Sequence, residues 1–203
     1  MRDADNIRQV ETLSPDMMGF ICWEDSKRYV PHTPSYLPVN CLRVGVFVNP
    51  TLDYVIRRQQ EMHFQIIQLH GKETPDFCAL LKKECNKEAN NVKLMKAFSI
   101  APNKPFPNTS AYNDTCDMFL FDTQCPTKGG SGKTFDWSTL NNYTGPRPFL
   151  LSGGIGPNCL TALRTFKHPY LAGIDLNSKF ETAPAVKNVT LLSKFIRNLK
   201  NNI

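Results

Sequence analysis

Short apolar segments alternate with amphipathic ones along most of the chain, and this alternation predicts its secondary structure. Continuous apolar runs are typical of strands buried in a parallel sheet, whereas apolar residues three or four positions apart mark one face of a helix. The expected strands lie at residues 17–22, 42–48, 66–69, 93–98, 118–122, 148–151 and 171–174. The expected helices lie at residues 3–13, 52–62, 74–84, 157–165 and 185–200, and the proline-rich segment 102–113 is expected to form at most a short irregular helix. Strands that alternate with helices in this way predict an α/β fold with a parallel sheet.

Glycine-rich turns follow only the later strands, and their position favours a barrel over an open sheet. No Gly-x-Gly-x-x-Gly turn follows an early strand, as an open dinucleotide-binding sheet would need. A glycine-rich segment, residues 152–156, instead follows the strand at 148–151, where barrels commonly hold a phosphate. The predicted fold is therefore a (βα)8 TIM barrel formed by one domain, residues 1–203. Because the chain opens on a helix, we expect it to lack the first β-strand of the eight.

A single carboxylate, Asp122, ends the apolar run at residues 118–121. In parallel sheets and barrels the chemistry lies at the carboxyl ends of the strands, so Asp122 is a candidate catalytic residue. The glycine-rich loop that follows could fold over a ligand. Its Gly132-Lys133-Thr134 segment resembles the end of a phosphate-binding P-loop, but Thr127 stands where the first glycine of that motif is needed. A nucleotide-binding function is therefore not expected.

Composition and charge exclude several other classes of function. Hydrophobic residues make up 41% of the chain and charged residues 21%, as in ordinary globular proteins. No apolar run approaches the ~18 residues that a membrane span needs, and the start of the chain has no signal-like apolar segment. The seven cysteines form no Cys-x-x-Cys pair, which indicates free thiols in a reducing, cytoplasmic location. The net charge of +6 is spread along the chain, so we expect an anionic small molecule rather than nucleic acid.

Seven motifs occur along the chain in the order and spacing of one enzyme family. They are Gly19-Phe20, the loop 26–29, the segment 44–49, Gln68-Leu69-His70-Gly71, Asp122-Thr123, the segment 129–137 and Leu151-Ser152-Gly153-Gly154. Together they resemble the phosphoribosylanthranilate isomerase family of tryptophan biosynthesis, and the match covers essentially the whole chain. The resemblance implies a compact (βα)8 barrel and an Amadori rearrangement of an aminoaldose phosphate to an aminoketose.

The resemblance implies that Asp122 is the general acid of this reaction. The acid protonates the furanose ring oxygen, a base then removes a proton from the neighbouring carbon, and the resulting enolamine tautomerises to the ketone. One acid and one base suffice for these steps, so neither a metal ion nor a cofactor is expected. Asp122 has to be protonated near neutral pH, and we expect the apolar floor of the barrel to favour the proton by desolvation.

The resemblance also implies which residues bind the two ends of the substrate. Arg28 matches the residue that holds the anthranilate carboxylate, a task suited to a guanidinium fork. Gly153 and Gly154 are expected to bind the phosphate through backbone amides at a helix N-terminus. The other expected substrate-binding residues are Gln68 and His70, which line the pocket, and Asp175, Asn177 and Ser178. Lys179 stands where the family has a glycine, so it either meets the phosphate as a point charge or points to solvent.

The base implied by the resemblance is a cysteine in a Lys-x-Cys-Gly segment that falls directly before Met1. Three explanations are open: Met1 is an internal methionine of an ordinary isomerase, the chain is short and inactive, or Cys22 has taken over as the base. Without the first strand, the strands at 17–22 and 171–174 leave two open edges. We therefore expect a destabilised barrel that associates through those edges.

Two other functions are compatible with the same fold. A catalytically dead barrel would bind the phosphorylated ligand without turnover. A sibling enzyme such as indole-glycerol-phosphate synthase would share the phosphate site but would need catalytic lysines at its strand ends. The strand ends of this chain carry Cys22, His70, Asp122 and Gly153 instead, which favours the isomerase.

Overall fold

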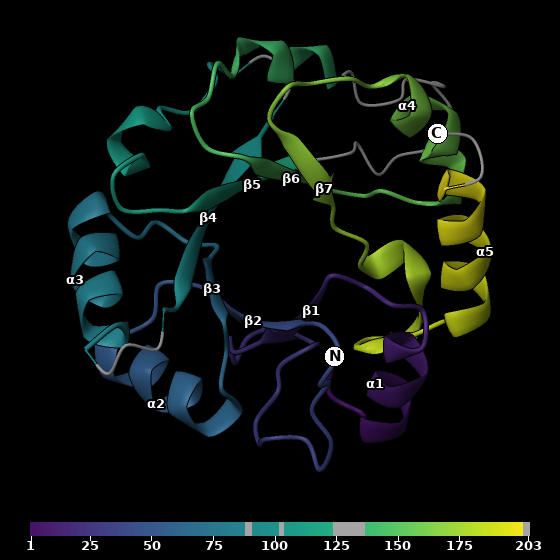
Figure 1. Ribbon diagram of the computed structural model, residues 1–203, viewed down its shortest axis with the longest axis horizontal. Helices are drawn as coiled ribbons and strands as arrows, with labels where there is room; N and C mark the ends of the chain where they lie inside the picture. Colours follow the sequence, from purple (N-terminus) through teal and green to yellow (C-terminus); the bar gives the residue numbers. More distant parts are fainter. Residues whose placement is uncertain (88–90, 102–103, 124–136, 201–203) are drawn as a thin grey trace.

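Seven parallel strands form the centre of the protein. The computed structural model describes residues 1–87, 91–101, 104–123 and 137–200. The strands are β1 (Met17–Ile21), β2 (Leu42–Phe47), β3 (Ile66–Leu69), β4 (Lys93–Ile100), β5 (Met118–Thr123), β6 (Phe149–Ser152) and β7 (Leu171–Ile174), and each pairs with the next in chain order. Figure 1 shows them curling around a common centre with the helices outside. The predicted parallel α/β barrel is confirmed.

Helices cover the outside of the sheet, and most begin where the sequence predicts. The α-helices are α1 (Ala4–Glu11), α2 (Leu52–Met62), α3 (Pro75–Cys85), α4 (Leu160–Thr165) and α5 (Val189–Lys200). The short 3-10 helices are η1 (Ser110–Tyr112), η2 (Trp137–Asn142), η3 (Pro157–Cys159) and η4 (Ser178–Phe180). The side chains of Asp3, Thr51 and Thr74 cap α1, α2 and α3 by accepting a backbone N–H of the first turn.

The predicted helix at residues 185–200 starts too early. A hairpin of β8 (Glu181–Ala183) and β9 (Val186–Lys187) occupies the preceding segment, and Ala185 turns it with a positive φ of 68°. The Asn188 side chain then accepts a hydrogen bond from the amide of Leu191 at 3.0 Å, which starts α5. Amphipathic spacing identified the helix but not its first turn, because a side-chain cap and a turn set that boundary. The expected helix at 157–165 likewise begins as η3 and continues as α4.

The chain from β1 to β2 contains no helix among its residues 22–41. It is held against α1 by Glu11, whose carboxylate accepts hydrogen bonds from the Tyr36 hydroxyl and from the amides of Val39 and Asn40, the latter two at 2.7 Å. The hydrogen bond from Tyr36 is the main reason why the pKa of Glu11 lies below its ordinary value. A buried carboxylate thus anchors a connection that has no helix of its own.

The apolar core has two layers, and strand alternation assigns each strand-end residue to one of them. The inner cluster inside the barrel contains Val44, Ile66, Met95, Ala97, Met118 and Leu120. A larger, aromatic-rich cluster fills the space between the sheet and the helices. Asp122 continues the inner series of Met118 and Leu120 on β5. Cys22 continues an outer series instead, because Met18 and Phe20 of β1 belong to the outer cluster.

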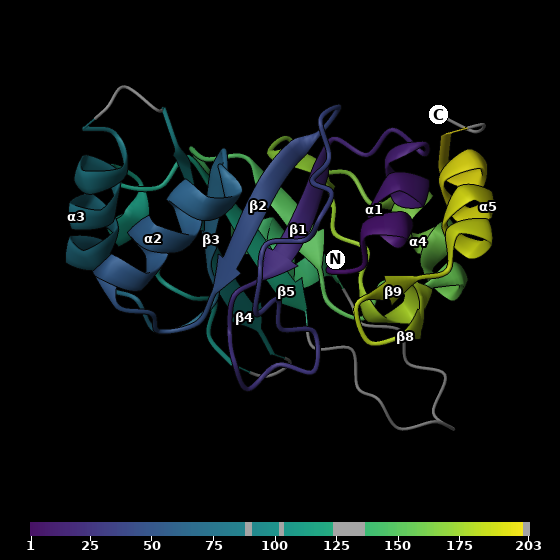
Figure 2. The same ribbon diagram turned by 90° about the horizontal axis from the view of Figure 1, so that it is seen from below.

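β1 and β7 are the two edges of the sheet, and no strand among the described residues pairs with their outer sides. The backbone nitrogen of Met1 donates a hydrogen bond to the Gly19 carbonyl of β1 at 2.7 Å. Figure 2 shows the start of the chain and the β8–β9 hairpin near the end of the barrel where the β1 and β2 arrows point. The structure thus places the start of α1, the β8–β9 hairpin and the carboxyl ends of the strands together. Within the described ranges, no helix is long and apolar enough to cross a membrane.

Candidate active site

Asp122 and His70 meet at the carboxyl ends of β5 and β3. The Nε2 atom of His70 lies 3.2 Å from Oδ2 of Asp122, and the two side chains are 29% and 32% exposed. Gln68 extends the row, since its Nε2 lies 3.1 Å from Nδ1 of His70. With the amide of Gln68 donating to Nδ1, the imidazole carries its proton on Nε2 and donates it to Asp122. His70 is therefore placed to stabilise negative charge on Asp122.

A buried ion pair fixes the backbone on both sides of His70. Lys96 and Glu73 have side chains only 3% and 2% exposed, and Nζ lies 3.1 Å from Oε2. Nζ also donates to the carbonyls of Leu69 at 3.2 Å and Gly71 at 2.8 Å, the residues that flank His70. Glu73 in turn accepts the amide of Gly71. The imidazole that meets Asp122 thus projects from a turn held by a closed network.

A second carboxylate, Asp175, lies beyond the end of β7. It accepts a hydrogen bond from the Ser152 hydroxyl at 2.8 Å. Burial, with a smaller contribution from the negative charge of Asp122, raises the pKa of Asp175 above its ordinary value. We expected the apolar floor of the barrel to desolvate Asp122, but about a third of the Asp122 side chain is exposed and His70 lies beside it. Burial acts most clearly on Asp175, and the two carboxylates are electrostatically coupled.

The turn after β6 has a backbone conformation that requires glycine. Gly153 and Gly154 have φ values of 99° and 65°, which L side chains rarely adopt. A Cβ atom on Gly153 would collide with the carbonyl of Thr123 at the end of β5. The loop after β7 is adjacent, because a Cβ on Gly156 would lie 3.2 Å from the Cβ of Lys179. The turn after β6 thus packs closely on the end of β5, and the loop after β7 lies next to it, in the region of Asp122 and Asp175.

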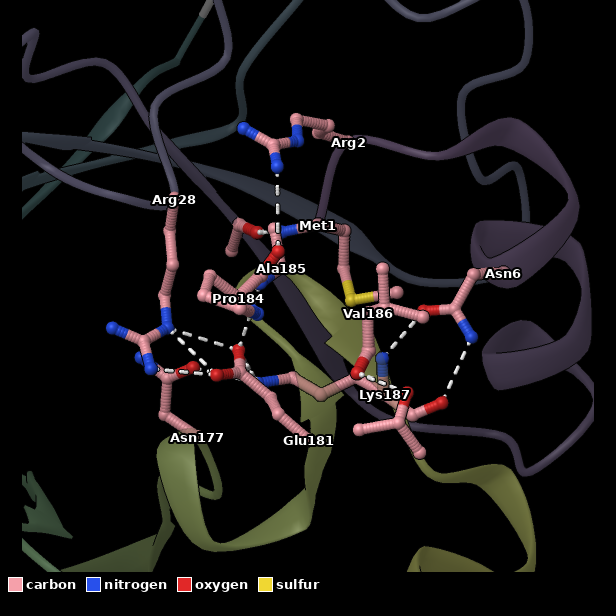
Figure 3. Close-up of polar contacts among 12 residues, drawn as sticks. Met1, Arg2, Asn6, Arg28, Asn177, Glu181, Pro184, Ala185, Val186 and Lys187 are labelled. Carbon is pink, nitrogen blue, oxygen red and sulfur yellow. Dashed lines mark hydrogen bonds and ion pairs between the residues drawn. The ribbon is translucent and has the colours of Figure 1, made fainter.

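Arg28 is bound by a carboxylate that was not among the predicted site residues. Figure 3 shows Glu181 of β8 facing the Arg28 guanidinium, with Oε2 2.8 Å from Nε and 2.6 Å from Nη2. Lys187 of β9 approaches Glu181 from the other side, and its Nζ lies 3.0 Å from Oε1 and 2.6 Å from Oδ1 of Asn177. Arg28 and Asn177, two of the predicted residues, are thus joined through two residues that were missed.

The other predicted residues are distributed as follows. Gln68, His70 and Asp122 form one hydrogen-bonded row, and Asp175 reaches the same region through Ser152. Ser178 and Lys179 begin η4 and are exposed. The loop at 129–136 that was expected to cover the site lies outside the described residues. No group of three or more metal-ligating side chains occurs within the described ranges.

Cys22 does not suit the role of a replacement base. Its side chain lies in the outer cluster, only 3% exposed, whereas Asp122 continues the inner face of the sheet. Burial raises the pKa of the Cys22 thiol, and the neighbouring Arg58 only partly opposes this. A thiol that is buried, protonated and on the wrong face of β1 cannot serve a substrate in the barrel mouth. We therefore assign Cys22 no part in the chemistry.

A parallel barrel whose mouth joins an acid to anion-binding groups is the arrangement of a (βα)8-barrel enzyme that acts on a small phosphorylated molecule. The model of one such family, N-(5'phosphoribosyl)anthranilate (PRA) isomerase, matches residues 2–198. A relative of that name from Phocaeicola vulgatus is 48% identical over 203 residues, which cover 100% of this chain and 96% of the relative. The chain therefore belongs to the PRA isomerase family, and its activity is that of an isomerase of tryptophan biosynthesis.

Solved structures agree with this assignment. Phosphoribosyl anthranilate isomerase from Thermotoga maritima superposes with a TM-score of 0.80 at 28% identity, covering 99% of this chain and 96% of that one. A second isomerase was solved in complex with reduced 1-(o-carboxyphenylamino)-1-deoxyribulose 5-phosphate. It shares the fold with a TM-score of 0.73 at 23% identity, covering 99% of each chain.

Proposed function

We propose that this chain isomerises PRA with Asp122 as the general acid. The observation that carries the assignment is the position of Asp122, which ends the inner face of β5 and meets His70 at 3.2 Å. Asp122 donates its proton to the furanose ring oxygen, and the carbon–oxygen bond of the ring opens toward a protonated imine. Loss of the proton from the neighbouring carbon then gives the enolamine, which tautomerises to the ketone. His70 stabilises the carboxylate that Asp122 becomes, by donating from Nε2.

The substrate contacts follow from the same geometry. The phosphate binds at the backbone amides of Gly153 and Gly154, in a turn whose positive φ values suit glycine and which packs directly against the end of β5. The residues Asp175, Asn177 and Ser178 of the adjacent loop complete this side of the pocket, and Gln68 lines it. Arg28 holds the anthranilate carboxylate. The reduced product analogue bound by the structural relative carries both a carboxylate and a phosphate. The resemblance to the family implies a cysteine as the catalytic base, and we assign this role to none of the described residues.

The sibling-enzyme alternative receives no support from the strand ends. It would need a lysine that is free to react at the barrel mouth. Lys96 of β4 is not free, because its ammonium pairs with Glu73 and donates hydrogen bonds to backbone carbonyls. Asp122 and His70 stand at the neighbouring strand ends instead.

The proposed acid is tested by Asp122→Asn. The change keeps the size of the side chain but removes its dissociable proton, so kcat for fluorescent PRA should fall by roughly a factor of 10²–10⁴. The assay is run with a chelator and without any added cofactor, because none is expected. Asp53→Asn is the matched control, since Asp53 lies exposed on α2. An Asp122→Asn protein as active as the control would overturn the assignment of the acid.

We also propose that the enzyme works in the cytoplasm as a single-domain protein. The six cysteines of the described residues are all free thiols, which fits a reducing compartment. The outer edges of β1 and β7, which no described strand pairs, are candidate surfaces for self-association; on β1, Met1 and Val30 already donate to the carbonyls of Gly19 and Ile21. Sedimentation velocity at several concentrations tests this last point, and a monomer at every concentration would rule it out.

A further inference from the structure

Glu181 binds only one edge of the Arg28 guanidinium. Its Oε2 atom takes Nε and Nη2, and its Oε1 atom lies 3.0 Å from Nε. A guanidinium has five N–H donors, so the edge formed by Nη1 and the second hydrogen of Nη2 is left over. Among the described residues, Nη1 has no hydrogen-bond acceptor, and Figure 3 shows one nitrogen of the guanidinium turned away from Glu181. That edge matches the two oxygens of a carboxylate.

Glu181 is itself held by a second cation. Its side chain is 5% exposed and that of Lys187 is 10% exposed, so both charges of this pair are largely withdrawn from water. Burial acts to raise the pKa of Glu181, but hydrogen bonds from Arg28 and Lys187 outweigh it and lower the pKa. Arg28, Glu181 and Lys187 taken by themselves carry a net charge of +1, although Asp175 also interacts with Lys187. The excess positive charge lies on Arg28, on the side that faces away from Glu181.

Hydrogen bonds hold the backbone on both sides of the Arg28–Glu181 ion pair. Asn6 of α1 donates to the carbonyl of Lys187 at 2.9 Å and accepts its amide at 2.7 Å, which fixes the β8–β9 hairpin to α1 (Figure 3). The amide of Ala185 donates to Oε1 of Glu181 at 3.3 Å. On the other side, the amide of Arg28 donates to the Ser26 hydroxyl at 3.1 Å. The segments that carry Arg28 and Glu181 are therefore both held by hydrogen bonds.

We propose that Glu181 is a positioning residue that, together with Lys187, presents the open edge of Arg28 to the carboxylate of the substrate. The proposal rests on the carboxylate-binding function of Arg28 proposed above. An arginine side chain loses about 2 kcal/mol of conformational entropy when it is fixed. Glu181 fixes the guanidinium before the substrate arrives, so less of that freedom is lost on binding. Its effect falls on recognition of the carboxylate and not on the proton transfers at Asp122.

The test compares two ligands on the full chain. One is the reduced product analogue, and the other is the same compound without its carboxylate. In Glu181→Gln, we expect affinity for the first ligand to fall about tenfold or more and affinity for the second to change by less than about twofold. KM for PRA should rise in parallel while kcat stays within about twofold. Glu181→Asp should recover part of the affinity, because it keeps the charge.

Glu61→Gln is the matched control. It removes another carboxylate from a guanidinium, that of Arg58 at 2.6 Å, but on α2. It should leave both affinities unchanged. If Glu181→Gln weakens the two ligands equally, Glu181 has only a structural role and the proposal fails. Thermal unfolding and circular dichroism identify a variant that does not fold, and Glu181→Asp then carries the comparison.

Arg28→Ala separates this proposal from the function on which it rests. In the Arg28→Ala background, Glu181→Gln should have no further effect on the carboxylate-bearing ligand. If Arg28→Ala does not weaken that ligand, the carboxylate-binding function of Arg28 itself is wrong. If Arg28→Ala weakens it tenfold and Glu181→Gln leaves it unchanged, only the positioning by Glu181 is wrong.

Discussion

Two ion-pair clusters lie near the barrel mouth. In one, every N–H group of the cation has an acceptor within the protein, and in the other some N–H groups have none among the described residues. The ammonium of Lys96 is surrounded by the carboxylate of Glu73 and three backbone carbonyls, and it is almost wholly buried. The Arg28 side chain is 27% exposed, and its guanidinium leaves one edge open beside Glu181. A closed cluster fixes backbone, whereas an open one retains binding capacity for a ligand. The same pairing of a cation with a glutamate thus fixes backbone in one place and, as we propose, presents a ligand-binding edge in the other.

Breaking the closed cluster should have the largest effect. Lys96→Met leaves Glu73 buried without its cation, and such a loss costs roughly 3 to 5 kcal/mol of folding free energy. Urea denaturation measures this cost. Turnover at low urea should also fall, because the turn that carries His70 loses its support.

Lys93→Met is the control for this prediction, since Lys93 is exposed on the same strand. The double variant Lys96→Met/Glu73→Gln should regain part of the lost stability by removing the unpaired charge. Equal stabilities of the Lys96→Met and Lys93→Met proteins would show that the buried pair contributes nothing.

The turn at Gly153 and Gly154 would bind its ligand through backbone amides, whereas the two clusters use side-chain donors. Gly153→Ala should cost roughly 2 kcal/mol, because the residue has a φ of 99° and the new methyl group meets the Thr123 carbonyl. Inhibition by inorganic phosphate should weaken as well, because the turn has to shift. Gly19→Ala is the stability control, as its Cβ would lie 3.8 Å from Val46, an ordinary contact. A phosphate inhibition constant unchanged in Gly153→Ala would remove the turn from the phosphate site.

The open cluster is also the part that the sequence did not reveal. Asp122 and Gly153 were found because their signals are local: an acid at the end of an apolar run and a glycine pair after a strand. Glu181 and Lys187 carry no such signal. Glu181 lies 153 positions from Arg28, in a hairpin that the amphipathic pattern of α5 had partly absorbed. Pairing over that distance depends on how the barrel closes, and period and propensity do not encode it.

Lys96 is a second residue whose partners the sequence does not reveal. It stands inside an apolar strand, where a charged residue would be expected to face solvent, yet it is 3% exposed. Apart from the carbonyl of Ala97 on β4, its acceptors come from β3 and from the turn that follows β3, which alternation along β4 alone does not locate. The sequence therefore predicts the strands and their faces, while the polar partners across strands need the folded structure.

The smallest expected effect has the opposite sign and concerns Asp175. Burial raises the pKa of this carboxyl, so ionising it costs folding free energy once the pH exceeds the value at which the unfolded chain titrates, about 3.9. Asp175→Asn removes that cost and should stabilise the protein by about 0.5 to 1 kcal/mol at pH 8. The gain should grow as the pH rises from about 4 and level off above the raised pKa of Asp175, because below pH 4 both states bind the proton. Urea midpoints of the two proteins across this range measure it, and KM for PRA should rise in the same variant. If the stability advantage of Asp175→Asn over the unchanged protein shrinks as the pH rises, the partners of Asp175 must stabilise its ionised form, as the partners of Glu181 do for that residue. The ionised Asp175 would then not destabilise the fold.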